Sequence, residues 1–248
     1  MEFVGRDRSV YTACSARQRG RSRTMPFLHV ARSLDDLLYE IMTWLVFYPV
    51  TLWRSIRHPL RTMDYARGEL GKEPGTQFGE TLRPPIFLLV TVMLAYAVEL
   101  AAVGESAIVN SDTGVANLID DDQSVMIFRI VAFALFPAVM AAIEARLARE
   151  PINRHTLQIP FYAQCFLAAP FVLALCLVTT GVRRPEHWLE PASFIAAAAA
   201  TALYIWAEAS WFVRSTNRGW IRSTSAAIGG TLGCLVVLGL LAWLLGGD

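Results

Sequence analysis

Residues 82–104 read LRPPIFLLVTVMLAYAVELAAVG, and this stretch decides the fold class. Arg83 and the pair Pro84-Pro85 precede an apolar run that is long enough to cross a bilayer, which takes about 20 residues. Glu99 is the only charged residue inside the run. Because a membrane interior offers no water to backbone N–H and C=O groups, the run is expected to be a helix.

Four more apolar runs of similar length follow the first one, which covers residues 85–104. They occupy residues 125–147, 159–181, 191–213 and 226–245. Hydrophobic residues make up 54% of the chain and charged residues 17%, whereas soluble domains carry about a quarter charged residues. The sequence therefore predicts an all-α fold, namely a polytopic membrane helix bundle with five transmembrane helices.

The region before the bundle divides into two predicted parts. Residues 1–33 are rich in Arg and lack an apolar run in secretory-signal position, which predicts a basic, disordered tail. A second interpretation takes Met25 as the true start. Residues 34–84 are expected to form a cytoplasmic region, and residues 85–248 the five-span transmembrane domain.

Apolar residues recur at helical spacing between residues 34 and 57, which predicts an amphipathic helix lying in the membrane interface. Its fully apolar part, residues 41–53, is shorter than a spanning helix and contains Pro49. The alternative is a sixth span with a proline kink. His58-Pro59 is expected to end this helix, and residues 60–81 to form a polar linker with one helical turn around residues 64–70.

Charge in the loops predicts the orientation. Arg is concentrated before the first span and in the loops 148–158 and 214–225, whereas loop 105–124 holds only acids and loop 182–190 is balanced. Basic loops stay in the cytoplasm. We therefore expect a cytoplasmic N-terminus and a periplasmic C-terminus, in the inner membrane of a bacterium, since the Ala-rich and Arg-rich usage is typical of one with a high-GC genome.

Charged residues inside spans are candidates for function because their burial in lipid is costly. Glu99 and Arg129 lie at similar depths near the outer ends of the first two spans. The favoured interpretation is a structural ion pair, and the alternative is a binding or proton-relay role.

Glu144 and Glu208 lie near the inner ends of the second and fourth spans. Their expected partners are Arg146, Arg149 or Arg214. The favoured interpretation is that both carboxylates snorkel to the interface, and the alternative is a polar pocket open to the cytoplasm.

Pro170 lies inside the third span, where it is expected to kink the helix. Gly229 and Gly233 have the spacing of small residues that lets helices approach closely. Packing within the bundle is favoured there over homodimerisation. Trp211 is expected at the interface and Trp206 inside the bundle.

The sequence shows no catalytic motif, no metal-ligand spacing and no cofactor-binding pattern. We expect no enzymatic activity, no cofactor and no bound metal, and we expect Cys165, Cys176 and Cys234 to be core residues. The basic tail lacks interleaved aromatic residues, so nucleic acid is not an expected partner. The expected partners are the lipid bilayer, other membrane proteins or a second copy of the chain.

The layout resembles the Yip-type family of five-span membrane proteins, whose small bacterial members are often labelled permease. The resemblance rests on the entry Leu82-Arg83-Pro84-Pro85, the five closely spaced spans, and the proline that ends Phe166-Leu167-Ala168-Ala169-Pro170 in the third span. It covers roughly residues 55–245. The segment nearest to the family's Asp-Leu-Tyr-Gly-Pro motif is Asp36-Leu37-Leu38-Tyr39, which lacks the Gly-Pro. The resemblance therefore does not imply binding to small GTPases.

The resemblance implies an adaptor or membrane organiser without catalytic residues. We therefore expect a non-enzymatic, Yip-like membrane organiser or partner-binding scaffold. The alternative is a small permease or transporter subunit with an intramembrane Glu/Arg site.

Overall fold

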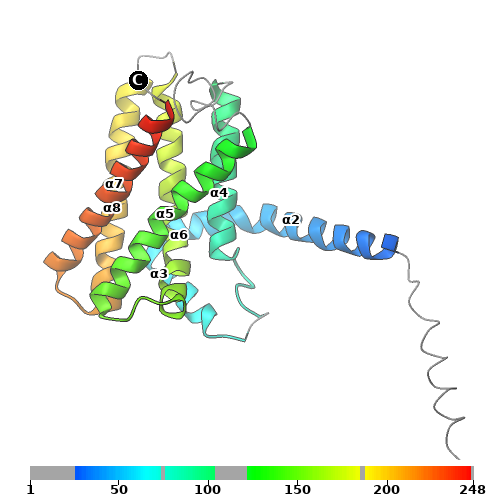
Figure 1. Ribbon diagram of the computed structural model, residues 1–248, viewed down its shortest axis with the longest axis horizontal. Coiled ribbons are helices and arrows are strands. Elements are labelled where there is room, and N and C mark those ends of the chain that lie inside the picture. The colour runs from blue at the N-terminus through cyan, green and yellow to red at the C-terminus, as the bar shows by residue number, and fades with distance from the viewer. Residues whose placement is uncertain (1–25, 74–75, 104–121, 185–187, 247–248) are drawn as a thin grey trace, which may run out of the picture. The chain divides into compact units, whose positions relative to one another are not determined.

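The computed structural model describes residues 26–73, 76–103, 122–184 and 188–246, and every regular element within these ranges is a helix (Figure 1). The helices are α2 (Pro26–Arg57), α3 (Pro59–Leu70), α4 (Pro84–Val103), α5 (Asp122–Ala148), α6 (Arg154–Val182), α7 (Leu189–Thr216) and α8 (Trp220–Gly246). Residues 1–25 of the predicted basic tail and most of the acidic loop before the second span lie outside the described residues. Residues 26–33, predicted as part of the disordered tail, are helical and form the start of α2.

The chain divides after Val46 into two compact units. The described part of the first unit, Met1–Val46, is the N-terminal part of α2. The second unit is Phe47–Asp248. This second unit includes α3 and the segment that leads into α4, so those residues pack with the apolar helices and not as a separate region.

The five predicted spans are confirmed as helices α4 to α8, with ends within a few residues of the expected ones. All five are long and apolar enough to cross a membrane, which is compatible with a multi-pass integral membrane protein. Helix α2 is not among them, since its longest apolar part is too short. Helix α6 occupies the centre and packs against α3, α4, α5 and α7, while α8 packs against α5 and α7 (Figure 1).

The first half of the expected linker is instead helical, because residues 59–70 form α3. Pro59 stands at the first helical position, where its fixed φ favours a helix start. Thr62, Met63, Ala66 and Glu69 recur at helical spacing and are buried. Helix α3 lies along α6 and also contacts α7. The sequence misses this helix because its buried face contains only one large apolar side chain.

Aromatic side chains fill the core between α4, α6 and α7. The ring of Phe87 lies 5.8 Å from that of Phe166 on α6. The ring of Phe171 stacks on Tyr204 of α7 at 4.2 Å, and Phe136 of α5 closes the same cluster at 5.4 Å from Phe171. Cys165, Cys176 and Cys234 are buried free thiols, as the sequence predicts.

The predicted packing of Gly229 and Gly233 inside the bundle is wrong. Both glycines are exposed, and a Cβ added to either one would have no atom within 4 Å. The close approach occurs at Gly230, where a Cβ would lie 2.6 Å from Cδ1 of Ile143 and 3.0 Å from Met140 of α5. Successive residues of a helix point about 100° apart. Gly230 therefore faces the bundle, while Gly229 and Gly233 face outward.

The turn before α4 is fixed by one buried carboxylate. Phe78 adopts φ 58°, which is uncommon for a residue with a side chain. Its backbone N–H donates to Oε2 of Glu69 at 2.7 Å, and Lys72 forms an ion pair with the same carboxylate. The Phe78 ring packs near Tyr65, Tyr162 and Phe166. Glu69 therefore joins the end of α3 to the turn that aims α4.

This arrangement predicts acid sensitivity. The hydrogen bond from Lys72, followed by the one from the Phe78 N–H, holds the pKa of Glu69 below its ordinary value. A lowered folded-state pKa contributes stability above the ordinary glutamate pKa of about 4.3, and this stability is lost as pH falls through the folded-state pKa. Glu69→Gln should lower the melting temperature at neutral pH and flatten its decline in acid.

The measurement is thermal unfolding in mild detergent between roughly pH 3 and pH 7. Glu73→Gln is the matched control, because Glu73 is exposed and lies one turn further along the chain. Equal acid slopes for the wild type and Glu69→Gln would show that this carboxylate does not hold the turn.

Candidate functional site

The candidate site residues form three groups of buried polar side chains. One group surrounds Glu99, and we call that end of the bundle the Glu99 end. The other two lie toward the opposite end, where α5 and α7 end, α6 and α8 begin, and α3 packs. We call this opposite end the α3 end. Arg218 donates to the backbone carbonyl of Leu147 there at 2.8 Å, which joins the start of α8 to the end of α5.

Glu99 holds three helices together. It is 5% exposed and forms the predicted ion pair with Arg129 of α5. Arg183, the C-cap residue of α6, forms a second ion pair with the other carboxylate oxygen at 2.8 Å. The Arg129 guanidinium also lies over the Tyr96 ring, 5.0 Å from its centroid. A buried carboxylate held by two guanidinium groups is well suited to fixing helix positions.

Sequence reasoning misses Arg183 as a partner of Glu99. A signal for it exists, because Arg183 is one of the basic residues that make loop 182–190 fit poorly as an outer loop. A cation in a loop that should be neutral or acidic is best explained by a carboxylate partner nearby.

Glu144 is buried by α3 and α7. It is 2% exposed, it forms an ion pair with Arg67 of α3, and it accepts a hydrogen bond from Nε1 of Trp211 at 2.9 Å. The Arg67 guanidinium lies over the Trp211 ring, 4.5 Å from its centroid. The ion pair, the indole hydrogen bond and the cation–π contact therefore connect α3, α5 and α7 at one point.

The expected partners of Glu144 and Glu208 are wrong, and neither carboxylate snorkels. Arg146 and Arg149 are exposed, and Arg214 pairs with Asp64 of α3 at 2.7 Å. The two tryptophan expectations are wrong as well: Trp211 is fully buried, whereas Trp206 is 54% exposed. The partner of Glu144 differs from the expected one because α3 packs against the bundle and places Arg67 beside this carboxylate, in the position expected for a loop arginine.

Glu208 is the buried span carboxylate that has no cationic partner among the described residues. It is fully buried, and Oε2 accepts a hydrogen bond from Nε2 of Gln164 on α6 at 3.0 Å. Oε1 of Gln164 has no hydrogen-bond partner among the residues described, and the hydroxyl of Tyr204 on α7 lies beside the Glu208 carboxylate. Such a set of oxygens can hold a proton or a small cation.

Pro170 lies inside α6, which runs as one helix on both sides of it. Its missing N–H leaves the carbonyl of Phe166 without the usual helical partner. Sequence reasoning overlooks a second mid-span proline, the buried Pro137 of α5. The kink at Pro170 stays a prediction.

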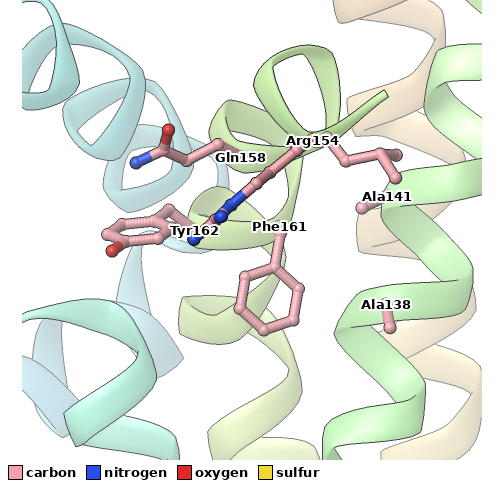
Figure 2. A pocket seen from close by; sticks show the side chains of 7 residues that line it. Ala138, Ala141, Arg154, Gln158, Phe161 and Tyr162 are labelled. Carbon is pink, nitrogen blue, oxygen red and sulfur yellow. The ribbon is translucent and has the colours of Figure 1, made fainter. Parts of the chain in front are cut away.

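Two cavities open near the α3 end. One, of about 440 Å³, lies between α5 and the first turns of α6. Figure 2 shows Phe161 and Arg154 of α6 on one side of it, with the small side chains of Ala138 and Ala141 of α5 opposite. The other, of about 530 Å³, has the Arg67–Glu144 pair in its wall and is also lined by His155. A cavity therefore exists beside Glu144, but it is lined mainly by α5 and α6 and does not include Glu208, so it is not the shared pocket between the second and fourth spans.

No group of three His, Cys, Asp or Glu side chains within the described ranges is placed to hold a metal ion. Comparison of the chain with protein-family models, with curated proteins and with solved structures found no match. The resemblance to the Yip-type family therefore stays a prediction.

The Glu99 cluster predicts a large effect of charge removal. Glu99→Gln removes the carboxylate that pairs with both Arg129 and Arg183, and breaking a buried pair in this way costs about 3–5 kcal/mol. Arg183→Gln should lower the free energy of unfolding less than Glu99→Gln does. The Arg183 side chain is 30% exposed, against 6% for Glu99, and Glu99 keeps its pair with Arg129 in that variant. Thermal unfolding in detergent measures both, and the double variant Glu99→Gln/Arg129→Gln should recover part of the loss. Full stability of Glu99→Gln would exclude this structural role.

Proposed function

We propose that the protein is a non-enzymatic membrane organiser of the Yip-like type that acts by binding other membrane proteins, beginning with a second copy of itself. The observation that carries the proposal is the outward face of α8. Gly229 and Gly233 are exposed at the spacing of helix-association motifs. Val236 and Leu240 continue the same face, and they are 67% and 56% exposed.

These two glycines make no close packing contact with the described part of the chain, since a Cβ added to either one would have no described atom within 4 Å. Gly230 differs, because its missing side chain admits Ile143 and Met140. A small-residue face that is not used within one bundle is suited to close contact with another helix in the membrane, where small residues let backbones approach.

The buried charges support the same proposal. Two of the three buried carboxylates in the spans are held by Arg on neighbouring helices. Such pairs pin the bundle and leave its outer faces for association. We further propose a bacterial inner membrane location with the α3 end in the cytoplasm, because Arg54, Arg57 and Arg61 lie near that end and loops there are basic.

The proposal predicts that Gly229→Ile/Gly233→Ile abolishes self-association, because the added side chains keep the two helices apart. Two copies with different tags are expressed together, extracted in mild detergent and recovered through one tag. The wild type should bring down its tagged partner copy, and the double variant should not.

Gly239→Ile is the matched control. Gly239 is exposed on α8 with open space around it, but it faces about 80° away from the motif. It should leave co-purification and the melting temperature unchanged. Equal recovery of the partner copy by the wild type and the double variant would refute this mode of association.

A small cation-coupled permease is the second candidate, and the oxygens around Glu208 are the observation that favours it. A coupling cation bound between α6 and α7 would engage these oxygens, and ligand binding to the folded state raises stability by about 2.7 kcal/mol at a hundredfold excess over Kd.

The second candidate predicts that NaCl or KCl raises the melting temperature of the wild type above its value in choline chloride at equal ionic strength. Glu208→Gln should lose this difference while remaining folded. Glu190→Gln, which removes an exposed carboxylate from the first turn of the same helix, is the control. Identical melting curves of the wild type in all three salts would remove the support for a cation site.

A further inference from the structure

A third cavity lies where α2 gives way to α3. It has a volume of about 410 Å³ and is bounded by the last turn of α2, the first residue of α3, and the facing sides of α6 and α7. One side of it is polar, with Ser55, Arg57 and the N-terminus of α3 at Pro59. The rest of its wall is almost wholly apolar.

The polar side has the features of an anion site. The Arg57 guanidinium makes no ion pair with any described residue. It lies over the Trp53 ring, with its central carbon 5.8 Å from the ring centroid. Helix α3 begins at Pro59, which lines the cavity, and His58 provides no side-chain cap, so the positive end of the α3 dipole lies beside this region. No acidic side chain is among the residues that line the cavity.

A buried hydroxyl points to the same ligand. Ser55 lines the cavity, the residue is 2% exposed, and its Oγ has no hydrogen-bond partner within the described part of the chain. A buried donor without a partner is costly. An anionic group held by Arg57 and by the start of α3 would accept a hydrogen bond from it.

The apolar part of the cavity fits a hydrocarbon chain. Leu167, Pro170 and Ala174 of α6 face Ala200 and Leu203 of α7 across it. The two alanines leave room, and the side chains that flank the opening are outward-facing and apolar, since Leu203 is 66% and Ile56 58% exposed. An opening of this kind faces membrane lipid in a five-span protein, so its occupant enters from the bilayer.

We propose that this cavity binds one phospholipid with an anionic headgroup. The phosphate lies against Arg57, Ser55 and the N-terminus of α3, and one acyl chain lies between α6 and α7 along Leu167, Pro170 and Ala174. A free phosphate ion would use the polar side alone and leave the apolar part empty, which is why a lipid is the better occupant. The proposal is independent of self-association, because the cavity does not involve α8.

The test is native mass spectrometry of the protein from micelles that contain equal amounts of phosphatidylglycerol and phosphatidylcholine. The wild type should retain one phosphatidylglycerol in preference to phosphatidylcholine. Arg57→Gln should lower this preference about fivefold, the effect of one basic residue near an anionic lipid. Arg61→Gln removes the same charge one turn away, at an exposed position that does not line the cavity, and should leave the preference unchanged.

A second variant tests the acyl chain. Ala174→Phe fills the apolar part and should reduce retention of both lipids, while its far-ultraviolet circular dichroism shows that the helices remain. Inorganic phosphate added in large excess should not displace the lipid. Unchanged preference in Arg57→Gln, unchanged retention in Ala174→Phe, or displacement by inorganic phosphate would each overturn the proposal.

Discussion

The contact on which the α3 end depends is the ion pair between Arg67 and Glu144, with the Trp211 indole bonded to the same carboxylate. Burying an ionised carboxylate without a cation is very costly, so Arg67 stabilises the buried position of Glu144, which is 2% exposed. Arg67 is in place only if α3 lies along α6, and α3 lies there only if the turn at Phe78 closes. The buried charge thus fixes a helix that does not itself cross the membrane, and with it the entry of α4.

Helix length explains why α3 is needed. Helices α5 to α8 contain 27 to 29 residues, which corresponds to about 40 Å or more at 1.5 Å per residue. A hydrocarbon core is about 30 Å thick, and α4, with 20 residues, matches it. The longer helices exceed this thickness, and at the α3 end α3 makes ion pairs with α5 and α7. There α3 covers side chains that lipid does not.

The sequence predicts the helices well and their partners poorly, and the reason is physical. Span length and apolar content are local properties, so α4 to α8 follow from the chain directly. Glu144 and Arg67 are far apart in the sequence, and their contact depends on how α3 packs, which no local pattern records. The same limit explains the two tryptophans: Trp206 and Trp211 lie about 140° apart around α7, and only the position of Glu144 decides which of them faces inward. The ion pair between Glu99 and Arg129 is predicted correctly, because consecutive antiparallel spans bring the two residues to the same depth.

The glycines of α8 show how a correct motif can lead to a wrong packing expectation. The spacing of Gly229 and Gly233 identifies a face that allows close approach, but spacing carries no information on which face of a helix meets its own bundle. Gly230 faces α5, and that places the motif on the outside. Arg57 also shows that a residue's role depends on what it packs against, which the local sequence does not record. Arg57 is basic and close to the membrane, yet unlike Arg67 it has no carboxylate partner among the described residues. Glu99 and Glu144 are matched by internal arginines, whereas Arg57, beside an apolar cavity, is matched under the proposal by an anionic group that the membrane supplies.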